Sequence, residues 1–135
     1  MRLRYLLLLA TLLFVASASK GICDDLQFHY DQTWFAKIDN DQFWDPGISH
    51  RNKWLNGRKA DGERFPGSST FFVWITDAWH LFQSIQYNCY RVIVTFLLAY
   101  TLGYRDWTQW WRWALIFVVT WCIGAAGFHA TYTLL

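Results

Sequence analysis

Residues 76–91, TDAWHLFQSIQYNCYR, lead directly into the apolar run at 92–102, VIVTFLLAYTL. The apolar side chains of both stretches recur with helical spacing, which predicts one long helix. Five polar side chains on it, here called the polar row, recur every three or four residues: Asp77, His80, Ser84, Asn88 and Arg91. They therefore share one face of the helix. An ionisable group at membrane depth is costly unless it is paired or hydrated, so this face must meet protein or water.

The composition is that of a membrane protein. Hydrophobic residues make up 54% of the 135-residue chain, charged residues only 16% and aromatic residues 21%, including ten Trp. Soluble proteins carry about 25% charged residues. The indole ring is apolar but its N–H seeks a polar partner, which suits a bilayer interface. A net charge of +2 is too small to indicate a nucleic-acid partner, so we expect the lipid bilayer as the main environment.

The N-terminus, MRLRYLLLLATLLFVASASK, has the pattern of a signal peptide. Arg2 and Arg4 precede an apolar run over residues 5–15, and small residues follow at 16–18 where cleavage would occur. The run is shorter than the roughly 20 residues of a bilayer span. We predict a signal peptide at 1–18, with a retained anchor as the alternative. In both cases the chain is exported from Ser19 onward.

Residues 19–69 form a polar segment punctuated by turn dipeptides such as Asn56-Gly57 and Pro66-Gly67. About fifty residues with these breaks cannot build a deep core alone, so we expect short helices on the exported membrane surface. Its first half is acidic. Its second half contains five basic residues: Arg51, Lys53, Arg58, Lys59 and Arg64. These cations either meet lipid phosphates or balance the acids that precede them.

Residues 70–135 are predicted to form a transmembrane hairpin, with helices at about 70–103 and 108–133. Ser68, Ser69 and Thr70 are candidate N-caps for the first helix. The second helix opens with an aromatic belt that would anchor it at the interface, at Trp107, Trp110, Trp111 and Trp113. The fold class is therefore an all-α membrane protein. An exported segment at 19–69 places the turn near Arg105 in the cytoplasm.

The second helix also carries a face of small residues, at Thr120, Gly124, Gly127 and Thr131. Small side chains let two helices approach closely, so this face predicts helix packing. His129 lies beside it, at the end that shares the exported boundary with Asp77 and His80. Two imidazoles and a carboxylate could bind a transition metal there, but we expect no cofactor as the main interpretation.

The blocks DQFWDPGISHRNKW and FPGSSTFFVWITDAWHLFQ, within residues 38–83, resemble those of small integral membrane proteins of Gram-negative bacteria. No activity is assigned to that group, so the resemblance implies a bacterial inner-membrane location and no catalytic residue.

Two functional hypotheses follow from the residues. In the first, the protein is a structural or accessory subunit, because a two-helix hairpin cannot cover the polar row. A second copy or another membrane protein would then lie against the row. In the second, the protein is a small enzyme or metal-binding protein at the outer leaflet. It would act on a lipid or headgroup through Asp77, His80 and His129.

Overall fold

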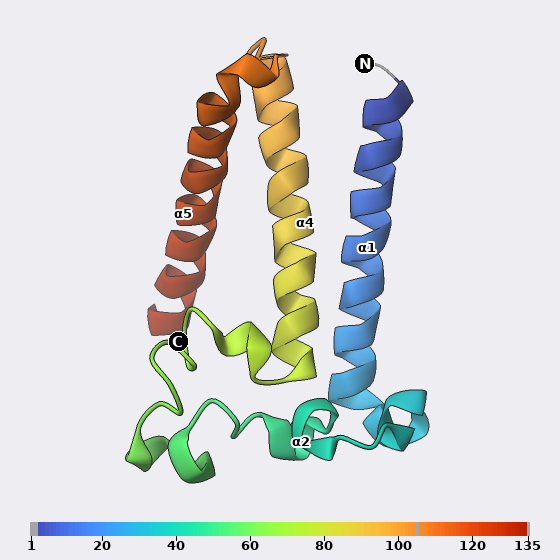
Figure 1. The fold of residues 1–135 in the computed structure, drawn as a ribbon, viewed down its shortest axis with the longest axis vertical. Helices are drawn as coiled ribbons and strands as arrows, with labels where there is room; N and C mark the ends of the chain where they lie inside the picture. The colour runs from blue at the N-terminus through green and yellow to red at the C-terminus, as the bar shows by residue number, and fades with distance from the viewer. Residues whose placement is uncertain (1–2, 105, 135) are drawn as a thin grey trace. The chain divides into compact units, whose positions relative to one another are not determined.

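The computed structural model describes residues 3–104 and 106–134, with only the backbone described at Trp107 and at residues 128–134. The fold is all-helical, with 76% of residues in helices and no strand among those described, which confirms the predicted class at that level. Three helices are long (Figure 1): α1 (Leu3–Phe28), α4 (Ala78–Thr101) and α5 (Trp110–Leu134).

The segment between α1 and α4 contains only short elements, in keeping with its turn dipeptides. Its α-helices are α2 (Asp41–Trp44) and α3 (Pro46–Ser49). Its 3₁₀ turns are η1 (Tyr30–Gln32), η2 (Trp34–Lys37), η3 (Leu55–Gly57), η4 (Lys59–Asp61) and η5 (Val73–Ile75). A further turn, η6 (Trp107–Gln109), directly precedes α5.

The chain divides into two compact units, one of residues 14–87 and one of residues 1–13 with 88–135. Both unit boundaries fall inside long helices, so α1 and α4 each contribute one end to each unit. The 14–87 unit contains all the short elements between α1 and α4, and the other unit contains α5.

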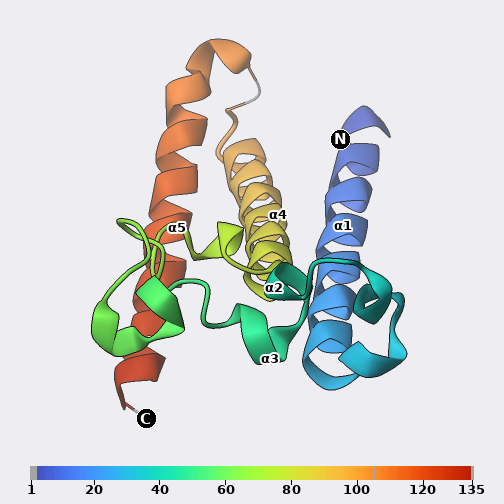
Figure 2. The ribbon, with the colours of Figure 1, turned by 60° about the horizontal axis from the view of Figure 1, so that its bottom comes forward.

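Aromatic packing against the end of α1 makes the core of the 14–87 unit. Leu26, Phe35 and Ala78 are almost fully buried and contact one another. Trp44 stacks on Phe35 with ring centroids 5.1 Å apart, and it also contacts Phe82 of α4 at 6.3 Å. Figure 2 shows α2 and α3 beside this end of α1 and the start of α4. Burial of large rings supplies most of the stability that so short a segment can gain.

Side-chain hydrogen bonds to the backbone connect segments that have no regular structure of their own. The Asn52 amide donates to the carbonyl oxygens of Thr76, at 3.0 Å, and of Gln42. The Ser68 hydroxyl, which is fully buried, donates to the Lys53 carbonyl at 2.7 Å. These bonds satisfy backbone carbonyls that a loop would otherwise leave exposed to competition from water.

The carboxylate of Glu63 fixes the turn at 67–69. It accepts hydrogen bonds from the Ser69 hydroxyl and from the N–H groups of Gly67 and Ser69, at 2.8 and 3.0 Å. The Ser69 hydroxyl and the two N–H groups favour the charged carboxylate, so they hold the pKa of Glu63 below its ordinary value of 4.5.

The sequence predicted that this helix would begin near residue 70, but α4 begins at Ala78. Residues 70–77 form turns and η5, because Gly67 at φ +79° redirects the chain and Asp77 provides the cap. Ser68 and Ser69, two of the expected caps, instead bond to Lys53 and Glu63. Asp77 was the cap that the sequence offered for this helix start. It was overlooked because the apolar side chains before it continue with helical spacing.

In the unit of residues 1–13 and 88–135, α4 contacts both neighbouring helices. Phe96 of α4 is 8% exposed and lies 5.3 Å from the Tyr5 ring of α1 and 5.7 Å from the Trp113 ring of α5. The hydroxyls of Thr95 and Thr120 are 3.5 Å apart. The first half of α1 therefore packs against α4, an arrangement that a hairpin prediction omits.

Helices α1 and α5 are long and apolar enough to cross a membrane, with mean hydropathies of 2.0 and 1.2 over their most apolar windows. Large apolar side chains project from both into the surroundings, for example Phe14 (75% exposed) and Ile123 (67%). Helix α1 continues through the small residues at 16–18, and Ala16 and Ser19 are buried.

Candidate functional site

Asp77 caps α4 and holds His80 at the same time. Its Oδ1 accepts the backbone N–H of His80 at 2.9 Å, which is the N-cap bond expected of an Asp at this position. Its Oδ2 accepts from the His80 ring Nδ1 at 2.7 Å and from the Thr76 hydroxyl at 3.2 Å. Asp77 is only 2% exposed, so both carboxylate oxygens are buried and hydrogen-bonded. The D-x-x-H spacing of the sequence thus brings the two side chains together.

The orientation of His80 follows from this bond. Because Nδ1 donates to Asp77, the neutral ring has its lone pair on Nε2, which can accept a proton or bind a metal. The indole of Trp79 meets the imidazole edge-on with centroids 4.9 Å apart and restricts its rotation further. The His80 side chain remains about one-fifth exposed, so solvent or a ligand can reach it.

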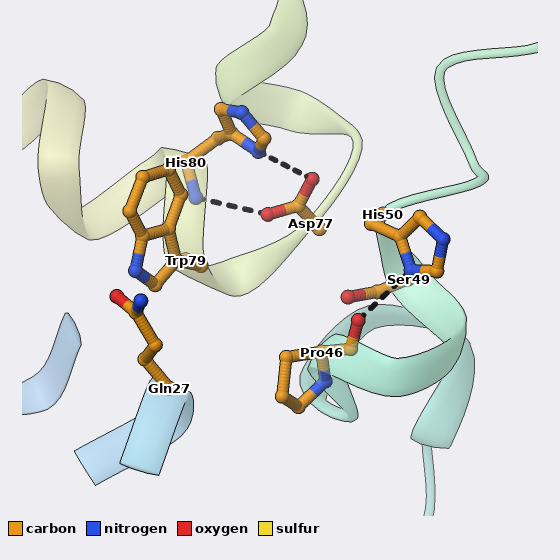
Figure 3. Close-up of a pocket in the computed structure, with 7 residues that line it drawn as sticks. All are labelled: Gln27, Pro46, Ser49, His50, Asp77, Trp79 and His80. Carbon is orange, nitrogen blue, oxygen red and sulfur yellow. Dashed lines mark hydrogen bonds and ion pairs between the residues drawn. The ribbon is translucent and has the colours of Figure 1, made fainter. Parts of the chain in front are cut away.

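A cavity of about 290 Å³ lies beside this pair. That is near the lower end of ligand pockets, about 300–1,000 Å³. The residues that line it come from α1, α3 and the start of α4, and Figure 3 shows them: Gln27, Pro46, Ser49, His50, Asp77, Trp79 and His80.

The cavity offers several hydrogen-bonding groups. The indole N–H of Trp79 is buried and has no partner in the described part of the chain. The Ser49 side chain comes from α3, which Asp45 caps by accepting the Gly47 N–H at 2.7 Å. His50 Nδ1 donates to the Pro46 carbonyl at 3.0 Å. The Trp79 N–H and the Ser49 side chain are both buried in the wall of this cavity.

The arrangement does not form a nucleophilic relay. The second ring nitrogen of His80 points away from Ser49 in Figure 3, and the described residues contain no hydrogen bond between the two. Activation of a serine requires the base within hydrogen-bond reach of the hydroxyl. His80 can therefore act as a proton acceptor or a ligand, but not on Ser49.

The three-residue metal site is not tested by the structure. The His129 side chain lies outside the described residues, whereas Asp77 and His80 are in contact. Elsewhere in the described chain, no group of three or more His, Cys, Asp or Glu side chains is arranged to hold a metal. The triad of Asp77, His80 and His129 stays a prediction.

The remainder of the polar row belongs to a different environment. Arg91 bonds to the Asn88 side chain at 3.4 Å, and its guanidinium lies 5.9 Å from the Trp121 ring centroid of α5. Ser84, between the two groups, is half-buried and also has a bonding partner. The row is one face of one helix, but its members make separate local contacts.

Two residues of the predicted packing face of α5 lie near residues of α4. Thr120 is beside Thr95, and a Cβ on Gly124 would lie 4.0 Å from the Arg91 guanidinium. A methyl group at position 124 would therefore make only an ordinary van der Waals contact with Arg91. Gly127 has a further interaction, and the Thr131 side chain lies outside the described residues.

The predicted interface anchors behave differently from one another. Trp110 and Trp111 are 65% and 52% exposed, and their role as anchors stays a prediction. Trp113 is half-buried and packs on Phe96. Arg112 lies over the Trp111 ring at 5.0 Å, which suits a cation at an interface, while the Trp107 side chain is outside the described residues.

Sequence reasoning found Asp77 and His80 but missed Gln27, Ser49 and His50 as cavity residues. The three lie far from residue 77 along the chain and have no periodic pattern that would connect them. The only local signal is Asp45-Pro46-Gly47, a cap followed by proline, which predicts the start of a short helix.

Comparisons with protein-family models, with curated proteins and with solved structures find no match for this chain.

We predict that the Asp77 carboxylate stabilises the fold through both of its oxygens. Asp77→Ala should lower the free energy of unfolding by about 1–2 kcal/mol from the lost cap alone. Asp77→Ser keeps a capping oxygen but loses the bond to the imidazole, so it should recover only the part of the loss that comes from the cap. Thermal unfolding of the full-length protein in detergent measures both, with Asp31→Ala on the exposed η1 turn as control. Equal effects at positions 77 and 31 would contradict the prediction.

Proposed function

We propose that the protein is a non-enzymatic integral membrane protein of the bacterial inner membrane, an accessory subunit that packs with itself or with another membrane protein. The observation that carries the proposal is the mismatch among its long helices. Helix α4 has 24 residues and is about 36 Å long at 1.5 Å per residue, enough to cross a bilayer. Yet among the described helices only α1 and α5 are apolar enough for that role.

The outward face of α4 supports a protein neighbour over lipid. Tyr87, Tyr90, Val94 and Leu97 follow one another at helical spacing and are 38–46% exposed. Two phenol groups on that face would meet hydrocarbon unless another polar surface lies alongside them. Hydrogen bonds between membrane helices contribute about 0.6–2 kcal/mol each, enough to favour association when several act together.

We further propose that α1 is retained as a membrane anchor, which was the alternative to a cleaved signal peptide. The support is that Ala16 and Ser19 are buried within the 14–87 unit, on either side of the expected cleavage point. The same face of α1 continues through Cys23, whose thiol donates to the Trp79 carbonyl at 3.5 Å, and ends at buried Leu26. Small residues at 16–19 thus serve helix packing. Arg2 and Arg4 would stay in the cytoplasm and the segment after α1 would be exported.

A second candidate function is ligand or metal binding at the outer leaflet, with a lipid or headgroup as substrate. The specific observation in its favour is the Asp77–His80 pair beside a cavity of about 290 Å³. Carboxylate-oriented imidazoles are typical of metal ligands and of general bases.

The accessory role predicts that the protein is not a single chain in mild detergent. Light scattering coupled to gel filtration should give a protein mass of two or more chains, or a companion should co-purify. Tyr87→Ala with Tyr90→Ala should shift the protein toward single chains, because both phenols leave the proposed contact face. Leu115→Ala with Val118→Ala, on an exposed face of α5, is the matched control. A monodisperse single chain without a companion would refute the accessory role.

Retention of α1 predicts the N-terminus of the mature protein. Intact-mass spectrometry of protein purified from membranes should show a chain that begins at residue 1 or 2. Ser19→Leu should weaken the packing of α1 and lower the thermal stability, since Ser19 is 4% exposed. A mature chain that begins at Ser19 would show instead that residues 1–18 are a signal peptide.

The metal version of the second candidate predicts a bound transition metal. Elemental analysis of the purified full-length protein should find less metal in His80→Ala and in His129→Ala than in the parent protein. His29→Ala, which removes an exposed imidazole outside the cavity, should leave the metal content unchanged. Equal metal content in all variants would remove this candidate.

A further inference from the structure

Residues 51–64 form a small hairpin with an unusual charge balance. Trp54 and Glu63 make an isolated antiparallel bridge, the Leu55 N–H bonds to the Gly62 carbonyl at 2.9 Å, and the Arg64 N–H bonds to the Lys53 carbonyl at 3.1 Å. Its sequence, RNKWLNGRKADGER, contains five basic and two acidic residues. We call this segment the basic hairpin.

Both acids of the basic hairpin are already engaged. Asp61 pairs with Arg58 at 2.8 Å, and Glu63 accepts the three hydrogen bonds of the 67–69 turn. Four cations are left over: Arg51, Lys53, Lys59 and Arg64. Within the described residues, none of these four lies within 4 Å of a carboxylate oxygen.

The acids that precede the hairpin do not neutralise it. Asp24 pairs with Lys20 on α1. Asp41 and Asp45 lie near Tyr30, where they add to the burial that raises the pKa of its phenol. Of the two interpretations of the basic residues, mutual balance with residues 24–45 therefore has no ion pair to support it in the described chain.

Apolar side chains project from the basic hairpin and from the segment that follows it. Two ammonium groups lie near Trp54, with the Nζ atoms of Lys53 and Lys59 at 6.0 and 5.9 Å from the centre of its ring. Several large apolar groups nearby in sequence are 40–67% exposed: Leu55, Phe71, Phe72, Trp74 and Ile75. Five exposed apolar groups are costly in water, and the four cations without a carboxylate partner give this segment a net positive charge. An anionic bilayer surface suits both, because phosphates attract the cations and the interface accepts aromatic rings.

We propose that residues 51–75 bind the surface of a bilayer containing anionic phospholipid. The four unpaired cations meet the phosphodiester headgroups, while Leu55 and the aromatic residues of 71–75 enter the boundary between headgroups and acyl chains. This surface does not involve the Asp77–His80 cavity or the outward face of α4. The proposal therefore stands or falls separately from the accessory role.

The test compares headgroups on the full-length protein in a neutral detergent. Isothermal titration calorimetry with micelles that carry phosphatidylglycerol should give tighter binding than with phosphatidylcholine. Each basic residue near an anionic surface changes affinity about fivefold, so Lys53→Gln with Lys59→Gln should weaken phosphatidylglycerol binding about 25-fold. Lys20→Gln with Lys37→Gln removes the same charge elsewhere in the 14–87 unit and should change binding little. Inorganic phosphate should not displace the lipid.

Three outcomes would overturn the proposal. They are equal affinity for the two headgroups, an equal loss in the control variant, and displacement by inorganic phosphate, which would assign the cations to a free anion. If the Lys53 and Lys59 variant does not fold, the proposal is tested on the unmodified protein by measuring how its affinity for phosphatidylglycerol depends on salt concentration. Its affinity for phosphatidylglycerol should fall with rising ionic strength, whereas an affinity independent of salt rejects a surface held by charge.

Discussion

The carboxylate of Asp77 is the group on which the 14–87 unit depends. A helix that begins next to a core leaves N–H groups that need partners, and here Asp77 satisfies that of His80 while also holding its ring. The position of this cap sets Ala78 as the first helical residue and so places Ala78 against Leu26 and Phe35. One side chain therefore links the start of α4, the core and the orientation of the imidazole.

Part of this structure could be predicted from residue patterns alone. The all-helical class and the apolar helices follow from hydropathy, and the contact between Asp77 and His80 follows from their spacing. The start of α4 was missed because residues 71–75 continue the apolar spacing, although the chain there forms turns. The extent of α1 was ambiguous because Ala16-Ser17-Ala18 is compatible with cleavage and with close helix packing. The cavity could not be predicted, since Gln27 and Ser49 meet only through tertiary folding.

The polar row shows how a chain can provide its own partners for costly groups. Arg91 lies over the Trp121 ring, and this cation–π contact gives the guanidinium a partner on α5. Asp77 and His80 hydrogen-bond to each other at 2.7 Å. The ionisable residues of the row therefore do not require a neighbouring protein. The exposed phenols of Tyr87 and Tyr90 on the outward face of α4 are the reason to propose one.

The bonds around Glu63 make the basic hairpin respond to acid in two opposite ways. The pKa of Glu63 in the folded protein lies below its ordinary value of 4.5. The stabilisation that its hydrogen bonds provide is therefore fully present above pH 4.5 and is lost as the pH falls through the folded pKa. Protonation would release the turn at Gly67 and Ser69, and the charge of the hairpin would rise from +3 to +4, since one of its two acids becomes neutral. In an acidified compartment the basic hairpin would bind a negatively charged surface more tightly, while its own folded structure would be less stable.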